Sequence, residues 1–189
     1  MNATGNVSAV VRSKQAVLSQ MLWIALFAAA TAIGARIEIP HHPVPYTMQT
    51  MFVLLAGAFL GARNGAMSQI LYLAVGVLGA PVFSIGGFGI ARLLGPTGGY
   101  LLAFPVAAAA VGYLVQTRRT LPWLFFSMAI GLAIIFVSGI IQLYAVVFGN
   151  WSDAFGAGFL VFSWWDVLKL SAAAMTYHEL SKRWARLPE

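Results

Sequence analysis

Asp166 and Lys169 are the residues of this 189-residue chain whose types and spacing point most directly to chemistry. They are the only ionisable pair inside an otherwise apolar run, and their i, i+3 spacing places both on one helix face. Charges in apolar spans are costly, so they usually face a bundle interior or a cavity. A carboxylate accepts hydrogen bonds and an ammonium donates them, which suits a ligand with an N–H beside a carbonyl, such as a urea or amide. The alternative is a structural ion pair.

Trp164 and Trp165 directly precede this pair. Large aromatic side chains at that place either wall an apolar pocket or anchor the helix end at the membrane interface. The residues alone leave both interpretations open.

A proline-rich segment, 40–50, is the second candidate region. Its three prolines make a stiff, extended approach to the apolar run that follows. Thr47 and Gln49 carry hydrogen-bonding groups there, and helix capping is their structural alternative. His41 and His42 are adjacent, so their side chains point apart on an extended chain, and without acidic neighbours they predict no metal site.

The third candidate is the motif Gly95-Pro96-Thr97-Gly98-Gly99-Tyr100, which follows Arg92. Glycines permit tight turns and the close approach of a ligand to the backbone. The spacing is not that of a dinucleotide-binding loop, and an isolated glycine-rich turn is weak evidence for a phosphate site. Thr97 is a candidate helix cap, and Arg92 either clamps a carboxylate or is simply solvated.

Small residues recur at helical spacing in two of the apolar runs. Gly57 and Gly61 form one such ridge, and two others share the first run: Ala25-xxx-Ala29 and Ala28-xxx-Ala32. This spacing lets helices approach closely, either inside the protein or against a partner.

The elements that position these residues must lie in a membrane, because the composition leaves no other class. Of the residues, 60% are hydrophobic and 8% are charged, against roughly 45–50% and 25% in soluble domains. So few charges cannot cover a soluble surface, which excludes an ordinary soluble domain, a disordered chain and a coiled coil. The basic residues, which give a net charge of +6, sit between apolar runs, so they predict topology and not nucleic-acid binding. The absence of cysteine excludes disulfides and thiolate chemistry.

Five charge-free windows and a sixth apolar stretch, which is broken only by Asp166 and Lys169, predict an all-α integral membrane protein with six transmembrane helices in one domain, residues 1–189. Each window reaches the roughly 20 residues that a spanning helix needs. The helices are expected near 17–36, 47–62, 65–79, 98–116, 122–148 and 157–181. The glycine- and proline-rich stretch 80–97 is expected to be an outer loop that packs on the protein.

The basic residues predict the orientation. With six helices, one side would hold Arg12, Lys14, Arg63, Arg118, Arg119, Lys182, Arg183 and Arg186, and the other only Arg36 and Arg92. The positive-inside rule then predicts that both termini are cytoplasmic and that 39–47 and 80–97 face outward. A cleaved signal peptide is the alternative for the first helix, but cleavage would leave five helices and spoil the charge balance.

Enzyme motifs do not match. The sequence has no Walker A pattern, so this chain is not expected to hydrolyse ATP through a P-loop. Ser138-Gly139 lacks the preceding glycine of a rhomboid-like protease, and there is no metalloprotease motif or glycosidase acid pair. We therefore expect a non-enzyme.

Three stretches together resemble the BioY family, the biotin-capturing S component of energy-coupling-factor (ECF) transporters. They are Val44-Pro45-Tyr46-Thr47-Met48-Gln49-Thr50, Leu94-Gly95-Pro96-Thr97-Gly98-Gly99-Tyr100-Leu101 and Asp166-Val167-Leu168-Lys169. Between the first two, Leu55-Ala56-Gly57 to Leu60-Gly61 and Gly79-Ala80-Pro81-Val82-Phe83 match in kind and order. The resemblance covers about residues 17 to 180. Trp165 stands where the family usually has a glycine, so the local pocket wall differs.

The resemblance implies six helices with both termini inside, in the cell membrane of a prokaryote. It implies capture of external biotin as a transported ligand and not as a cofactor, with a membrane coupling subunit and two cytoplasmic ATPases as partners. The implied biotin-binding residues are Asp166, Lys169, Arg92, Tyr46, Thr47, Gln49, Phe83, Gly95, Thr97, Tyr100 and Trp164. The implied coupling-subunit interface is Ala25, Ala28, Ala29 and Ala32.

Two other functions remain open. One is a stand-alone proton-coupled carrier in which Asp166 is the relay. The other is a structural or assembly protein with no ligand.

Overall fold

The computed structural model describes residues 3–160 and 163–183, with side chains described for 14–159 and 164–182. The chain termini, Arg186 and the side chains of Arg12 and Arg183 lie outside these ranges. Within them the fold is helical, apart from a short antiparallel ladder of β1 (Glu38–Ile39) and β2 (Tyr46–Thr47), in which Ile39 faces Tyr46. The expected all-helical class is confirmed.

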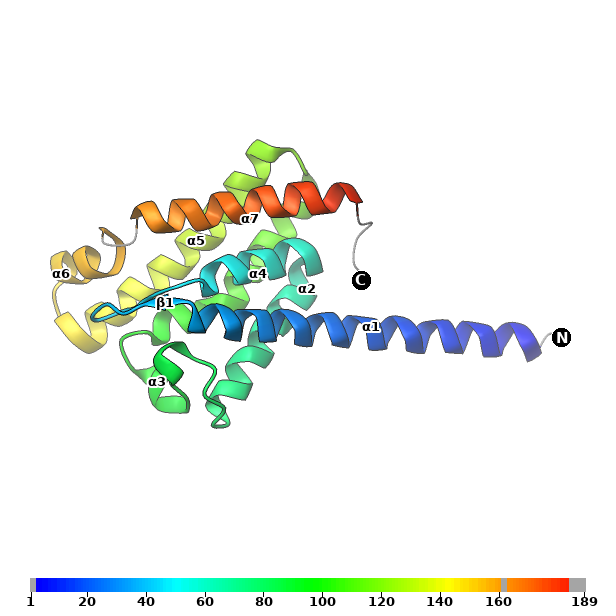
Figure 1. The fold of residues 1–189 in the computed structure, drawn as a ribbon, viewed down its shortest axis with the longest axis horizontal. Helices are drawn as coiled ribbons and strands as arrows, with labels where there is room; N and C mark the ends of the chain where they lie inside the picture. Colours follow the sequence, from blue (N-terminus) through cyan, green and yellow to red (C-terminus); the bar gives the residue numbers. More distant parts are fainter. Residues whose placement is uncertain (1–2, 161–162, 184–189) are drawn as a thin grey trace.

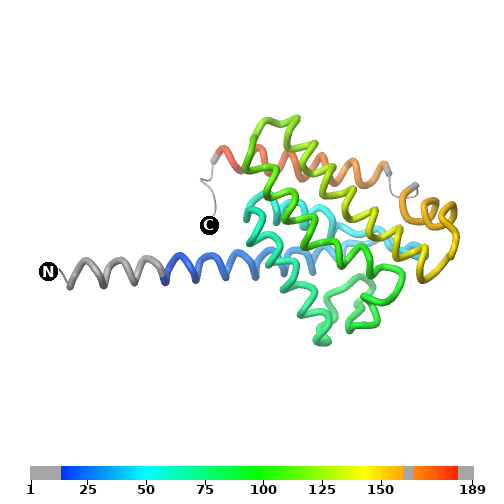
Figure 2. Tube along the Cα trace, turned by 180° about the vertical axis from the view of Figure 1, so that it is seen from behind, coloured from blue at the N-terminus to red at the C-terminus, as the bar shows by residue number. Residues whose placement is uncertain are grey.

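Five long helices build the described part of the chain: α1 (Ala3–Arg36), α2 (Gln49–Val77), α4 (Gly98–Thr117), α5 (Leu121–Leu143) and α7 (Ser163–Arg183). Shorter elements join them: the 3₁₀ turn η1 (Ser84–Gly86), α3 (Ile90–Leu94), the π-helical turn η2 (Tyr144–Phe148), α6 (Trp151–Phe155) and the π-helical turn η3 (Gly156–Leu160). α2, α4 and α5 form the packed centre, with α1 against α2, and α7 against α2 and α5. Figure 2 shows α4 and α5 side by side, with α1 passing behind them.

Two expected helices, 47–62 and 65–79, are the arms of one bent element, α2. The bend is at Gly61, whose φ of 78° is a conformation that glycine adopts without steric penalty. Gly112 of α4 packs on the backbone of Gly61 and Ala62, where any side chain would collide. Gly57 of the same ridge packs against the Ala108 carbonyl. In Figure 1 the two arms run in different directions from the bend. The glycine ridge of α2 therefore serves internal packing.

Four helices of the described chain are long and apolar enough to cross a membrane. They are Lys14–Arg36, Gln49–Val77, Gly98–Thr117 and Leu121–Phe148. α7 is not among them, since Asp166, Lys169 and the polar last turns interrupt its apolar run. The structure thus supports a protein that crosses the membrane several times.

The last two expected helices differ from the structure at one boundary. The expected helix 122–148 is α5 continued by η2, and it ends at Gly149, whose left-handed φ of 61° stops the helix. The expected helix 157–181 begins later, at Ser163, because α6 and η3 occupy 151–160. After the bend in α2, the chain therefore changes direction a second time, at α6 and η3, before the helix that carries Asp166. The uniformly apolar composition of this stretch gives no sign of it.

Candidate ligand-binding site

Asp166 and Lys169 form a buried ion pair on the inner face of α7. Lys169 Nζ lies 2.6 Å from Asp166 Oδ1, and the two residues are 4% and 2% exposed. They begin a buried stripe at helical spacing that continues through Leu170, Ala173, Ala174 and Tyr177. This register, set by apolar and small residues farther along the helix, turns both charges into the bundle.

Lys169 also connects α7 to the proline-rich segment. Its ammonium donates a hydrogen bond of 2.9 Å to the backbone carbonyl of Thr47. Thr47 belongs to β2, whose pairing with β1 fixes the chain between α1 and α2. Two of the three candidate regions of the sequence therefore meet at one ammonium group.

A cavity lies at this junction and encloses about 500 Å³ of space free of protein atoms, including its open mouth. Its walls come from the proline-rich segment, the start of α2, the loop 80–89, α4, α5 and α7. The lining residues are Val44, Pro45, Thr47, Gln49, Thr50, Ser84, Thr97, Tyr100, Leu101, Phe104, Ile135, Phe136, Asp166 and Lys169. The polar residues of the proline-rich segment and the ion pair of α7 thus face a chamber whose other walls are mostly apolar.

One acceptor of the ion pair has no partner within the described residues. Asp166 Oδ2 is buried and makes no hydrogen bond, and neither does the hydroxyl of Thr50. The Thr50 hydroxyl lies near the carboxylate, although the two groups do not reach hydrogen-bond geometry. A buried carboxylate oxygen without a donor is costly. Since both residues line the cavity, the geometry presents an acceptor and a hydroxyl to a ligand.

The glycine-rich motif positions Thr97 and Tyr100 on the cavity wall. A side chain at Gly98 would collide with the Leu93 carbonyl, and one at Gly99 with the Ser138 carbonyl of α5. The Ser138 hydroxyl donates to the Gly99 carbonyl at 2.8 Å. The glycines therefore serve close helix packing rather than phosphate binding.

Tyr100 spans the cavity wall and the turn before α7. Its ring packs edge-on against Phe136, with centroids 6.1 Å apart. Its hydroxyl donates to the Gly158 carbonyl of η3 at 3.0 Å. The motif thereby reaches across to the segment that leads into the Asp166 helix.

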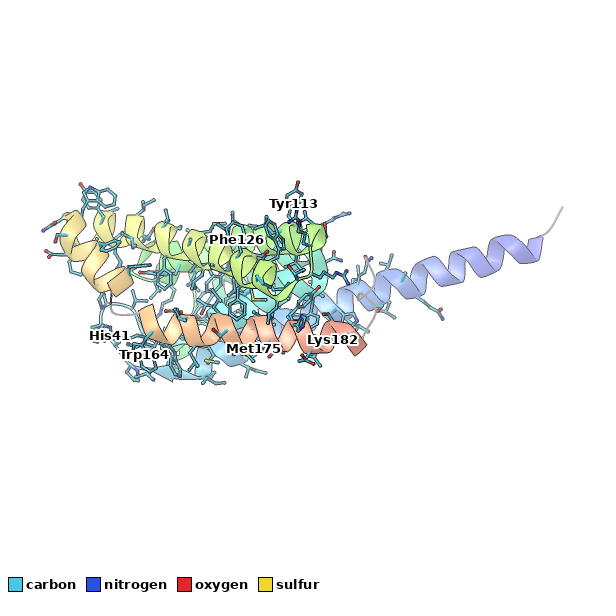
Figure 3. The ribbon with its side chains drawn as sticks, turned by 90° about the horizontal axis from the view of Figure 1, so that it is seen from above. His41, Tyr113, Phe126, Trp164, Met175 and Lys182 are labelled. Carbon is cyan, nitrogen blue, oxygen red and sulfur yellow. The ribbon has the colours of Figure 1, made fainter. Side chains whose placement is uncertain are left out.

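The structure does not bring five of the expected site residues to the cavity lining. Tyr46 packs edge-on against His41, and Phe83 lies behind the cavity against Tyr72. The Gly95 carbonyl accepts a hydrogen bond from Gln142. Trp164 is 70% exposed on the outer face of α7 (Figure 3). Its ring packs against that of Trp165, with centroids 5.5 Å apart. Trp164 therefore does not wall the pocket, because helical spacing turns it away from Asp166.

Arg92, the fifth of these residues, lies on α3 beside the loop 80–89. Its guanidinium packs over Gly87, where a side chain would collide with it. No salt bridge holds Arg92 within the described part of the chain.

Several lining residues escaped the sequence analysis. Phe104, Ile135 and Phe136 are apolar residues in apolar helices, so no pattern distinguishes them from core. Gln142 and Ser138, which hold the glycine motif from α5, are polar residues in a charge-free run, and that signal could have found them. Ser84 carried no signal beyond its place in the loop.

The alanine ridges of α1 separate into two faces. Ala28 is buried in the core and Ala32 packs against it, whereas Ala25 and Ala29 are exposed. Only the Ala25–Ala29 row is therefore available to a partner. A metal site is not evident, since the described residues hold no group of three or more His, Cys, Asp or Glu that could bind an ion.

The comparisons with known proteins agree with the motif resemblance. The BioY family model matches residues 6–186. The probable biotin transporter BioY of Lysinibacillus sphaericus is 42% identical over 78% of this chain and 79% of its own length. The biotin transporter BioY of Thermotoga maritima is 36% identical over 87% of this chain and 97% of its own length. Both are similar over most of their lengths.

The fold also has a solved counterpart. A crystal structure at 2.1 Å of the S-component for biotin from an ECF-type ABC transporter is similar with a TM-score of 0.80, covering 99% of this chain and 97% of the other. Its sequence identity of 23% makes this a similarity of fold. With a family model over nearly its whole length and relatives of 42% and 36% identity, the chain belongs to the BioY family.

Proposed function

We propose that this chain is a multi-pass membrane protein that captures external biotin and works as the S component of an ECF transporter. The observation that carries the proposal is the unpartnered Asp166 Oδ2 beside Lys169 at the wall of a mostly apolar cavity. The relatives named as biotin transporters and the biotin S-component with the same fold support this assignment.

The chemistry of the cavity suits both ends of biotin. The ureido ring has two N–H donors and one carbonyl acceptor, which match the free carboxylate oxygen of Asp166 and the third N–H of Lys169. Tyr100, Phe104 and Phe136 offer apolar surface to the thiophane ring and the valerate chain. Arg92 is the proposed partner of the valerate carboxylate.

The proposed topology has six spans, counted as α1, the two arms of α2, α4, α5 and α7. In Figure 1 the start of α1 and the end of α7 point toward the same end of the molecule. Figure 3 shows Lys182 and Tyr113 at that end, and His41 and Trp164 at the other. The excess of basic residues supports a cytoplasmic assignment for the Lys182 end, so that the cavity faces outward.

The proposed partners are a membrane coupling subunit and two cytoplasmic ATPases. The chain contains no Walker A motif, so ATP-driven transport would need ATPases supplied by other chains. The exposed row of Ala25 and Ala29 on α1 is the proposed contact with the coupling subunit, since small side chains permit close helix approach. The proposed role is that of a transporter subunit and not of an enzyme.

Direct binding to the purified protein tests the proposal. Calorimetry should give saturable binding of biotin, weaker binding of desthiobiotin, which keeps the ureido ring but lacks the sulfur, and none of unrelated vitamins. Absence of biotin binding by a folded protein would refute the function.

Transport in liposomes distinguishes this function from the second candidate, a stand-alone proton-coupled carrier. A buried carboxylate in a membrane helix is also what a proton relay needs. Uptake that depends on a proton gradient and proceeds without the ATPase partners would favour a stand-alone carrier.

A further inference from the structure

Tyr72 is a buried residue of α2 whose hydroxyl joins two segments that line the cavity, although Tyr72 does not line it. Tyr72 is 1% exposed. Gln49 Nε2 donates to its hydroxyl at 2.5 Å, and this hydroxyl donates to the Val82 carbonyl at 3.2 Å. Gln49 belongs to the cavity wall, and Val82 begins the stretch of loop that brings Ser84 to that wall.

The hydrogen bonds continue from Gln49 to the ion pair. The Thr47 hydroxyl donates to Gln49 Oε1 at 3.0 Å, and the Thr47 carbonyl accepts from Lys169 at 2.9 Å. From Thr47 to Val82 every donor points in the same direction, so each bond polarises the next. Thr47 thus links Lys169 on α7, through its backbone carbonyl, to the bonds that run from its hydroxyl to the loop 80–89.

The ring of Tyr72 contacts the same loop to which its hydroxyl is hydrogen-bonded. It packs edge-on against Phe83 with centroids 5.5 Å apart, and Phe83 fills a notch at Gly76 where a side chain would collide with its ring. The outer side of the loop is held by solvent-exposed bonds, from Arg36 to the Pro81 carbonyl and from the Ile85 amide to Glu38. Tyr72 is therefore a buried side-chain attachment of the loop, in addition to the backbone bond of 2.8 Å from the Gly89 amide to the Gly76 carbonyl.

We propose that Tyr72 is a positioning residue that couples occupancy of the cavity to the order of the loop 80–89. A ligand that engages Asp166 and Lys169 fixes Thr47 and Gln49, and Gln49 then holds the Tyr72 hydroxyl where it captures Val82. Such a coupling is reciprocal, so an ordered loop retains the ligand equally. The inference rests on the proposed function, because biotin is the ligand used to test it.

The test combines Tyr72→Phe with a reporter in the loop. The chain has no cysteine, so Val82→Cys gives a single thiol that is partly buried and does not line the cavity. In this background biotin should slow thiol labelling. Adding Tyr72→Phe should raise the ligand-free labelling rate, reduce the protection by biotin about tenfold and weaken biotin binding about tenfold, equivalent to about 1.4 kcal/mol.

Thr31→Val is the matched control. Thr31 is also buried and bonded to a glutamine amide, that of Gln69, but it lies between α1 and α2, away from the cavity and the loop. This variant should leave labelling and biotin affinity unchanged.

The outcomes separate the inference from the function. Wild-type affinity or undiminished protection in Tyr72→Phe would overturn the coupling. If the parent protein binds no biotin, the proposed function fails. The ligand-free labelling rate is still informative in that case, because an unchanged rate in Tyr72→Phe would overturn the attachment of the loop to Tyr72. Should Tyr72→Phe not fold, Gln49→Met removes the same link while filling its space, and it must raise the ligand-free labelling rate.

Discussion

Lys169 and Thr47 are 122 residues apart in the chain, yet the ammonium of one lies 2.9 Å from the backbone carbonyl of the other. The same ammonium is 2.6 Å from Asp166 Oδ1, which leaves Asp166 Oδ2 as the open acceptor. The two charges therefore differ in role. Lys169 joins two walls of the cavity, and Asp166 presents its open oxygen at the cavity wall.

Changing either residue of the ion pair should weaken biotin binding without unfolding the protein. Asp166→Asn and Lys169→Met should each lose about 1.5–3 kcal/mol of biotin binding, roughly ten- to a hundredfold in affinity. Each single change also leaves the other residue of the pair buried without its counter-charge, so both single variants should have a lower unfolding temperature. The double change removes both charges and should restore part of the lost unfolding temperature. Calorimetric binding and thermal unfolding of all three variants check this. A folded double variant with wild-type affinity would remove both residues from the site.

Arg92→Ala should weaken biotin more than biotin amide or biocytin. Those two ligands lack the free valerate charge that we assign to this guanidinium, so only biotin loses a charge-assisted hydrogen bond, about 1.5–3 kcal/mol. Competition binding with the three ligands measures the difference. Equal losses for all three would show that Arg92 does not contact the carboxylate.

Tryptophan in the exposed Ala25–Ala29 row should disrupt contact with the coupling subunit without weakening biotin binding. Ala25→Trp and Ala29→Trp should block association with the coupling subunit and keep biotin affinity, because a large side chain prevents close helix contact. Ala28→Trp should instead unfold the protein, since Ala28 is buried. Co-purification and binding assays distinguish them, and loss of biotin binding in the outer-row variants would argue for internal packing there.

Gly99→Ala should destabilise the bundle by about 1–3 kcal/mol, the usual cost of overpacking. The new methyl would press on the Ser138 carbonyl and the Gln142 side chain. Gly156→Ala is the control, since no atom lies within 4 Å of its added methyl. Thermal unfolding in detergent compares the two, and equal stability would contradict the close contact of α4 with α5.

Accessibility of single cysteines tests the orientation. The exposed Phe88 in the loop 80–89 serves as the outer reporter, and the exposed Thr120 between α4 and α5 as the inner one. Phe88→Cys should react with impermeant reagents from outside the cell, and Thr120→Cys only after the membrane is opened. The reverse pattern would invert the topology and place the cavity on the cytoplasmic side.

The sequence by itself determined the class of protein and the identity of the central pair. Sixteen charges in 189 residues cannot cover a soluble surface, and an ion pair at i, i+3 in an apolar run can lie only on one helix face. The motifs around Thr47, Thr97 and Asp166 also identified three walls of the cavity, because polar residues and glycines stand out against an apolar background.

Only the tertiary structure decided which other residues reach the cavity and which do not. Phe104 and Phe136 line it, while Phe83 packs behind it and Trp164 faces outward. These four aromatics look alike in sequence, since in a membrane both the core and the surface are apolar, and composition no longer reports which way a side chain points. That direction follows from how the helices pack, which depends on close contacts such as Gly99 with Ser138 and on the bend at Gly61.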